Sequence, residues 1–185
     1  MTTDTHRAMT FFEGLEAPEG WRAELVRGEI VLSMSSDLTA NLIVESVRDR
    51  IPHRRWHSVT TQDVSIPGRV SELQPDLVVW ARGAAEVRGR AIPAPAVTLV
   101  VEVVSRTSVL RDYRTKRELY AEGTVPAYLI VDPVKGVCVL LTEPTVAAAS
   151  GPPDYVAERT TRFGEPIPLD LLGITLDTTE FQPCS

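Results

Sequence analysis

Three ionisable side chains lie in apolar surroundings, where a charge is unusual. Asp76 follows a proline at the start of the apolar segment 77–80, and Glu102 interrupts the aliphatic run 97–104. Lys116 falls inside an apolar stripe of the next segment. A buried ionised carboxylate costs several kcal/mol unless a cation, a metal or a set of donors meets it. Two carboxylates and one amine can hold a hard divalent cation and complete its charge balance, so these residues predict a metal site with oxygen ligands.

Two predicted strands must position the carboxylates. The run 97–104 is typical of a central strand covered on both faces, because a half-exposed strand would alternate polar and apolar residues. Glu102 shares one face of this strand with Val100 and Val104. The segment 75–80 predicts a second central strand, and proline is tolerated at the first residue of a strand. Asp76 is therefore expected near the end of the same sheet.

A predicted helix over 109–123 must position the lysine. At about 100° per residue, the helix has an apolar stripe and an opposite, solvent-facing side. The stripe comprises Val109, Tyr113 and Tyr120, with Leu119 at its edge. The solvent side comprises Arg111, Arg114, Glu118 and Glu122. Lys116 lies within the stripe, and Asp112 precedes it by one turn.

The pair of charges in this stripe has two interpretations. Asp112 and Lys116 are spaced i,i+4, so they could form a surface ion pair in which the lysine stem lies along the apolar face. Considered alone, the helix favours that interpretation. Asp76 and Glu102 shift the balance towards a functional site, because three ionisable residues in apolar surroundings are stronger evidence than one.

Several motifs resemble the Uma-type restriction endonucleases, a bacterial branch of the PD-(D/E)XK nuclease superfamily. They are Gln-Pro-Asp-Leu-Val-Val at 74–79, Val-Val-Glu-Val-Val-Ser at 100–105, Asp-x-x-x-Lys-x-x-x-Tyr at 112–120, the strand 125–133 and the first hairpin at 23–31. The similarity runs from about residue 8 to the C-terminal region. In the wider superfamily the lysine follows the glutamate by two residues, but residue 104 here is valine. The resemblance therefore implies that Lys116, on the following helix, is the matching lysine.

The resemblance implies a metal-dependent nuclease with defined roles. Asp76 and Glu102 would ligate Mg²⁺, with Mn²⁺ as a second possibility, and the carbonyl of Val103 would add a ligand. Lys116 would position the attacking water and stabilise the developing negative charge. Glu24 is placed near the metal by the resemblance, although an exposed strand residue facing its hairpin partner is the alternative. Asp112 would orient the lysine.

A second hypothesis is a catalytically weak or inactive nuclease fold that acts as a binding or accessory module. Gln74, Asn41 and Ala23 depart from residues that are common in the family. The formal net charge is −6, from 19 basic and 25 acidic residues, which is the wrong sign for holding phosphates by bulk electrostatics. Basic residues do concentrate over 47–57 and 105–117. These runs are compatible either with a local nucleic-acid rim or with ordinary solvated helix faces.

The expected partner is nucleic acid, with DNA favoured, although RNA, duplex and single strands stay open. A homodimer is also considered. The N-terminus has no apolar signal region, and no stretch approaches a membrane span. Cys138 and Cys184 are too few for a disulfide framework. We therefore expect a protein of the bacterial cytoplasm with no membrane partner.

The element pattern predicts an α/β fold, with one domain over residues 1–185 and a mixed central sheet flanked by helices. The resemblance implies that this domain is restriction-endonuclease-like. Expected helices lie at 8–16, from about 37 to 51, and at 109–123. Besides the two central strands, expected strands lie at 21–26, 29–34, 58–66, 127–131, 137–141 and 155–163. Expected loops lie at 81–96 and 143–154, and the tail 167–181 holds short apolar pieces.

Overall fold

The computed structural model describes residues 3–34, 37–68, 70–84, 89–146 and 151–184. Its centre is a six-stranded sheet with the strand order β11-β10-β9-β8-β6-β3. The strands are β3 (Trp56–Val59), β6 (Leu77–Ala81), β8 (Leu99–Val103), β9 (Ala127–Asp132), β10 (Val137–Thr145) and β11 (Asp154–Arg162). β8 and β9 pair in parallel, and the other neighbours pair antiparallel. The predicted α/β fold with a mixed central sheet is thus confirmed.

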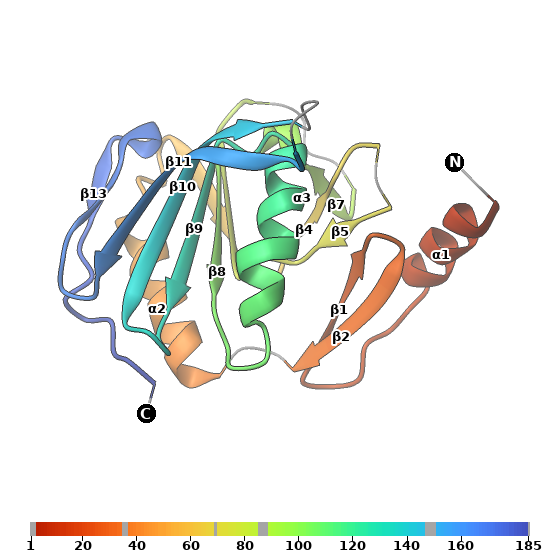
Figure 1. Ribbon diagram of the computed structural model, residues 1–185, viewed down its shortest axis with the longest axis horizontal. Coiled ribbons are helices and arrows are strands. Elements are labelled where there is room, and N and C mark those ends of the chain that lie inside the picture. The colour runs from red at the N-terminus through yellow and green to blue at the C-terminus, as the bar shows by residue number, and fades with distance from the viewer. Residues whose placement is uncertain (1–2, 35–36, 69, 85–88, 147–150, 185) are drawn as a thin grey trace.

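A helix packs on each face of this sheet (Figure 1). The helix α2 (Leu38–Arg50) packs Ile43, Val44 and Val47 against one face. It begins where predicted, because the Asp37 carboxylate accepts a hydrogen bond of 2.9 Å from the Ala40 N–H. The segment between β8 and β9 crosses the opposite face as a helix, as parallel neighbours require. Every residue of β8 and β9 is consequently buried, which explains their continuous apolar runs.

A second, five-stranded sheet has the order β2-β1-β5-β4-β7 and was not predicted as a separate unit. Its strands are β1 (Trp21–Val26), β2 (Glu29–Met34), β4 (Asp63–Ser65), β5 (Glu72–Leu73) and β7 (Ala91–Pro93). The hairpin β1–β2 has the predicted bounds. Residues of this sheet share one apolar cluster with the crossover helix and with the inner face of the central sheet. The crossover helix therefore lies between two sheets.

The predicted strand 58–66 is wrong. The chain forms β3 in the central sheet and β4 in the second sheet, with a bend between them where Thr61 adopts a positive φ of 55°. One alternating segment thus serves two sheets, because the bend redirects the chain. Residue alternation alone does not reveal such a break.

Other boundaries also differ from the predictions. The first helix, α1, spans Thr3–Glu13 rather than 8–16. The predicted loop 81–96 contains β7 and the 3₁₀ helix η1 (Ala94–Ala96), while its residues 85–88 lie outside the described residues. β10 continues to Thr145, so the loop predicted over 143–154 is shorter, and residues 147–150 lie outside the described part of the chain.

The C-terminal tail forms a small hairpin from β12 (Ile167–Leu169) and β13 (Ile174–Leu176), joined by the 3₁₀ helix η3 (Asp170–Leu172). Leu169, Leu172, Leu176 and Phe181 pack in the same core cluster as α2. Among the described residues, no helix is both long enough and apolar enough to cross a membrane.

The C-terminal end of the crossover helix is fixed by a close backbone approach. A Cβ added to Gly123 would lie 2.7 Å from the Cβ of Ala94 and 3.2 Å from Cδ1 of Ile66. We expect Gly123→Ala to lower the free energy of unfolding by about 1–3 kcal/mol through overpacking. Gly14→Ala is the matched control, since the nearest atoms to its added Cβ lie at 3.8 Å. Urea unfolding of both variants tests this, and equal stabilities would contradict the tight contact.

Candidate functional site

The crossover helix is wound differently from the α-helix that the sequence predicts. Residues Arg111–Lys116 form a π-helix, η2, which continues as the α-helix α3 (Arg117–Glu122). A π-helix closes i→i+5 hydrogen bonds, is rare, and often marks a functional site. The wider turn also explains why one prediction is wrong. Arg111 was assigned to the solvent side, but its side chain is only 19% exposed and its Nε lies 3.9 Å from Glu24.

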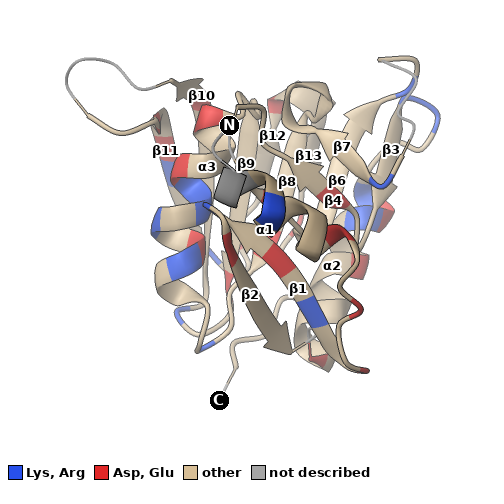
Figure 2. Ribbon diagram, turned by 90° about the vertical axis from the view of Figure 1, so that its right-hand side faces the viewer, with Lys and Arg blue, Asp and Glu red and all other residues tan. Residues whose placement is uncertain are grey.

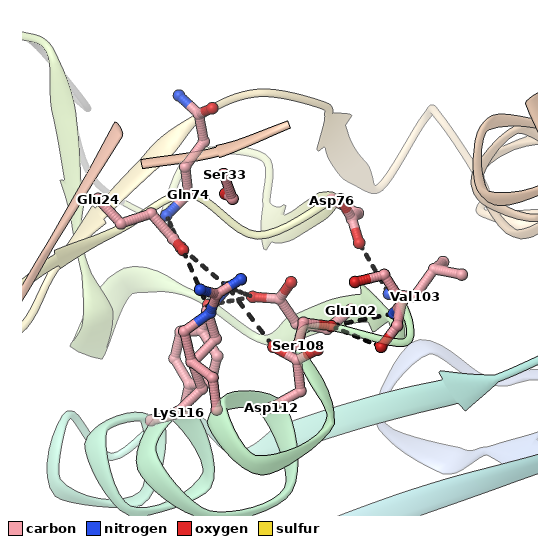
Figure 3. Close-up of polar contacts among 12 residues, drawn as sticks. Glu24, Ser33, Gln74, Asp76, Glu102, Val103, Ser108, Asp112 and Lys116 are labelled. Atoms are coloured by element: carbon pink, nitrogen blue, oxygen red, sulfur yellow. Dashed lines mark hydrogen bonds and ion pairs between the residues drawn. The ribbon is translucent and has the colours of Figure 1, made fainter. Parts of the chain in front are cut away.

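Lys116 is fully buried at the end of this π-helix. Its Nζ lies 2.6 Å from Oε1 of Glu102 and 2.8 Å from Oε1 of Glu24 (Figure 3). The distance from Nζ to the Asp112 carboxylate is 3.9 Å, which is too long for a hydrogen bond. The surface ion-pair interpretation is therefore wrong, and the lysine instead joins carboxylates from two sheets.

Glu102 receives two hydrogen bonds on a single oxygen. Its Oε1 accepts from Lys116 Nζ at 2.6 Å and from the Tyr120 hydroxyl at 2.9 Å. Tyr120 belongs to the apolar stripe of the helix, and the structure shows that its hydroxyl binds Glu102. Burial raises the pKa of Glu102 to about 8, opposed by Lys116 and reinforced by the nearby carboxylate of Asp76. A proton or a divalent cation is therefore favoured on this residue.

Glu24 is fully buried, so the exposed-strand alternative is wrong. Its Oε1 accepts a hydrogen bond of 2.9 Å from the backbone N–H of Gln74. Burial alone would raise the pKa of Glu24, but attraction to Lys116 and Arg22, together with that N–H donor, holds it below its usual value. Oε2 of Glu24 is buried without a hydrogen-bond partner. Glu24 is thus the charged partner of the lysine.

Asp76 lies beside Glu102 on the neighbouring strand. Leu77 pairs with Val101 in the antiparallel register, so one further step sets Asp76 opposite Glu102, with both side chains on one face. Oδ2 of Asp76 accepts a hydrogen bond of 2.7 Å from the backbone N–H of Val103. The structure therefore brings together the four predicted catalytic side chains, and Figure 3 shows them converging: Glu24, Asp76, Glu102 and Lys116.

Arg22 belongs to the same cluster and was missed by the sequence analysis. Its Nη1 lies 2.7 Å from Oδ1 of Asp76, and its Nε donates to Ser33 Oγ at 3.3 Å. The available signal was the period of two along β1, which puts Arg22 on the same face as Glu24. The sequence allows Glu24 to be either near the metal or exposed to solvent. It therefore does not decide whether the face with Arg22 and Glu24 is buried.

The lysine keeps its proton in this setting. Burial disfavours the ammonium, but Glu102, Glu24 and Asp112 outweigh that effect and raise the pKa of Lys116 above its ordinary value. A protonated lysine cannot act as a general base at neutral pH. It can donate hydrogen bonds and stabilise negative charge.

The carboxylates fit a divalent ion that takes some of its ligands from the protein and the others from water and substrate. Within the described ranges, no group of three His, Cys, Asp or Glu side chains forms a ready-made metal cage. Magnesium is commonly bound by one or two carboxylates plus waters and substrate phosphates. Asp76 and Glu102 on adjacent strands supply that minimal pair. The peptide group of Val103 lies beside them, since its N–H donates to Asp76.

Two clefts lead to the cluster. The larger, of about 890 Å³, is lined by residues that include Arg22, Val103, Ser105, Arg106 and Arg111. The smaller, of about 430 Å³, is lined by residues that include Arg22, Asn41, Arg48, Gln74 and Asp76. Arg22 lines both clefts. Both signs of charge occur on β1 and along α3 (Figure 2), so the acidic total conceals local basic groups.

The mixed sheet, the crossover helix and the carboxylate–lysine cluster define a nuclease-like α/β fold. A family model, Uma2, described as “Putative restriction endonuclease”, matches residues 9–179. The chain therefore belongs to the Uma2 family, as its motifs predict, and that membership supports a nuclease-like function.

Solved structures support the fold. One similar structure is described as “a putative nuclease belonging to DUF820 from Anabaena variabilis ATCC 29413”. It superimposes with a TM-score of 0.67 at 12% sequence identity, covering 94% of this chain and 96% of that chain. No curated protein matches the sequence.

The raised pKa of Glu102 predicts a pH-dependent effect of Glu102→Gln in metal-free buffer. A carboxyl whose folded pKa is raised from 4.5 to about 8 stabilises the fold fully below pH 4.5, and this contribution is lost as the pH rises through about 8. Because a glutamine side chain cannot ionise, the variant should gain stability relative to wild type over that interval. The gain is bounded at about 1.4 kcal/mol per pH unit for one proton.

Urea unfolding at several pH values measures this difference. Glu158→Gln is the control, because Glu158 is about half exposed, with 47% side-chain exposure in its ion pair with Arg117. A Glu102→Gln deficit that grows with pH would instead make Glu102 a member of a stabilising ion pair.

Proposed function

We propose that this chain is a metal-dependent endonuclease that hydrolyses phosphodiester bonds of nucleic acid, with DNA as the favoured substrate. Mg²⁺ is the proposed ion, and Mn²⁺ is the alternative. The observation that supports the proposal best is the Lys116 ammonium, fully buried 2.6 Å from Glu102 and 2.8 Å from Glu24. Asp76 lies opposite Glu102 on the neighbouring strand. Membership in the Uma2 family supports the same class of reaction.

Phosphodiester hydrolysis needs an activated water, neutralised phosphate charge and help for the leaving oxygen. In the proposal Asp76 and Glu102 hold the divalent ion, and the Val103 carbonyl is a further ligand. A bound ion would supply Lewis acidity and lower the pKa of a water. Tyr120 fixes the Glu102 carboxylate through its hydrogen bond to Oε1, so the other oxygen of that carboxylate can serve the ion.

Lys116 acts as a hydrogen-bond donor in this scheme. An ammonium has three N–H donors, and Glu102 and Glu24 accept two of them. For the third, no acceptor within hydrogen-bond distance occurs in the part of the chain that the structure describes. We assign this donor to the attacking water or to a phosphate oxygen. Glu24 and Asp112 position the lysine rather than touch the reacting atoms.

The electrostatics of the clefts are compatible with a phosphate backbone despite the net charge of −6. Arg22, Arg106 and Arg111 line the larger cleft, and Arg48 lines the smaller one. This arrangement favours the local-rim interpretation of the two basic runs. A homodimer and a cytoplasmic location stay predictions from the sequence.

An accessory protein without turnover is the second candidate. It is favoured by the closure of the cluster, since Lys116 is 0% and Glu102 only 1% exposed. In that case the lysine and its carboxylates would form a structural ion network. The two candidates differ in metal binding and in the effect of removing the lysine.

Metal binding should depend on Asp76. We expect Asp76→Asn to weaken Mg²⁺ or Mn²⁺ binding by at least about tenfold, the loss typical for removal of one strong interaction of about 1.4 kcal/mol. Isothermal titration of each metal into the metal-free protein measures this. Asp63→Asn is the control, because Asp63 pairs with Arg90 outside the cluster. Equal metal affinity in Asp76→Asn and wild type would overturn the ligand assignment.

Removing the lysine should abolish cleavage while leaving metal binding largely intact. We expect Lys116→Met to lower the cleavage rate by about 10²-fold or more, because a charge-stabilising donor is lost. Lys116→Arg should not restore the rate, since a planar fork does not fit a pocket built for an ammonium. Stability should fall by about 3–5 kcal/mol, as buried carboxylates lose their partner, so folding is checked by circular dichroism.

The matched control for this test is Arg114→Met, since Arg114 lies on the exposed side of the same helical segment. Cleavage is measured on a DNA that the wild type cuts. Cleavage by folded Lys116→Met at the wild-type rate would exclude the proposed role and favour the structural network.

A further inference from the structure

Arg22 occupies a position where a metal ligand and the substrate paths meet. Its Nη1 lies 2.7 Å from Oδ1 of Asp76, which makes it the direct counter-ion of a proposed ligand. Its side chain is 15% exposed, whereas that of Asp76 is 4% exposed. Arg22 lines both clefts. The guanidinium thus faces solvent-accessible space while one of its nitrogens contacts the carboxylate.

The contacts of Arg22 leave part of the guanidinium available. Nε donates to Ser33 Oγ at 3.3 Å, and Nη1 donates to the Gln74 carbonyl at 3.4 Å in addition to Asp76. For Nη2, no hydrogen bond to a described residue is present. The two hydrogen bonds to neutral acceptors are long, so the ion pair with Asp76 is the main polar contact that holds the side chain.

With every group ionised, as metal binding requires of Glu102, the net charge of the cluster changes sign when a divalent cation is added. The fully ionised cluster has four carboxylates, on Glu24, Asp76, Glu102 and Asp112, and three cations, on Arg22, Arg111 and Lys116. Its sum is −1. A divalent ion changes the sum to +1, and one phosphodiester anion then makes it zero. Without Arg22 the ion alone would neutralise the cluster, and no net attraction for phosphate would remain.

We propose that Arg22 serves two anions in turn. In the metal-free protein it neutralises Asp76, and once Asp76 ligates a divalent ion it binds a non-bridging oxygen of the substrate phosphate. This inference rests on the proposed nuclease function and assigns the phosphate-binding residue of that site. Arginine suits the task because its planar fork can hold two phosphate oxygens while it stays charged.

This change of partner, from Asp76 to the phosphate, gives a reason for an arginine to contact a proposed metal ligand. A cation 2.7 Å from Asp76 competes with the metal for the same carboxylate and repels it. Removal of Arg22 should therefore tighten metal binding, whatever else the side chain does. If Arg22 only joined the two sheets, its removal would leave DNA affinity unchanged, whereas phosphate binding predicts that DNA affinity falls in the same variant.

The first test measures Mn²⁺ binding to the metal-free protein by isothermal titration calorimetry. We expect Arg22→Gln to bind Mn²⁺ about three- to tenfold more tightly than wild type, the range set by loss of one partly exposed competing ion pair. Arg48→Gln is the matched control, because Arg48 is an exposed arginine of α2 that lines the same cleft as Asp76. Its Mn²⁺ affinity should stay within about twofold of wild type.

The second test measures binding of fluorescein-labelled DNA, as a duplex and as a single strand, with Ca²⁺ in place of Mg²⁺ to prevent cleavage. We expect Arg22→Gln to weaken DNA binding by about tenfold and to lower the slope of log affinity against log salt by about one. Arg22→Lys keeps the charge but not the fork, so its Mn²⁺ affinity should match wild type while its DNA affinity is reduced. This variant keeps the test decisive if Arg22→Gln does not fold.

The outcomes distinguish failure of the proposed role of Arg22 from failure of the proposed nuclease function. If Asp76→Asn loses Mn²⁺ binding but Arg22→Gln does not bind Mn²⁺ more tightly than wild type, the proposed role of Arg22 is overturned and the metal site is retained. Unchanged DNA affinity in Arg22→Lys would also overturn it. Failure of the wild type to bind Mn²⁺ would overturn the proposed nuclease function itself. Tighter Mn²⁺ with weaker DNA in one variant is the result that supports the exchange.

Discussion

The contact of one buried ammonium with two carboxylates organises this molecule. Lys116 lies on the crossover helix, Glu102 on the central sheet and Glu24 on the second sheet, and none of the three is more than 1% exposed. Each charge would cost several kcal/mol without its partners. The two sheets and the helix between them are therefore restricted to arrangements in which these side chains meet.

Such a network is weak support for stability, and its perturbed ionisation makes it a candidate functional site. A buried ion cluster can often be replaced by well-packed apolar residues with no loss of stability. Around this cluster apolar packing is plentiful, since Val100, Leu119 and Tyr128 are almost fully buried beside it. Perturbed ionisation next to open clefts therefore marks this cluster as a candidate functional site.

The π-helix and the α-helix that follows it supply several side chains to the cluster. The segment Arg111–Lys116 carries Arg111 and Lys116 towards Glu24 of the second sheet, while Asp112 stays buried beside them. The adjoining α-helix then presents Tyr120 to Glu102. One continuous crossover thus supplies a cation, a hydrogen-bond donor and a further carboxylate to a glutamate on the preceding strand.

The sequence by itself determined the central strands, the hairpin around Arg27–Gly28, and the anomalous charges at Asp76, Glu102 and Lys116. These follow from local rules, because periodicity states which side of a segment is apolar and a charge within it stands out. Only the tertiary structure decided that 58–66 is divided between two sheets, that Glu24 is buried and that Arg22 contacts Asp76. Those facts depend on which face of one element meets which face of another. Residues far apart in the chain settle that choice, and no single segment encodes it.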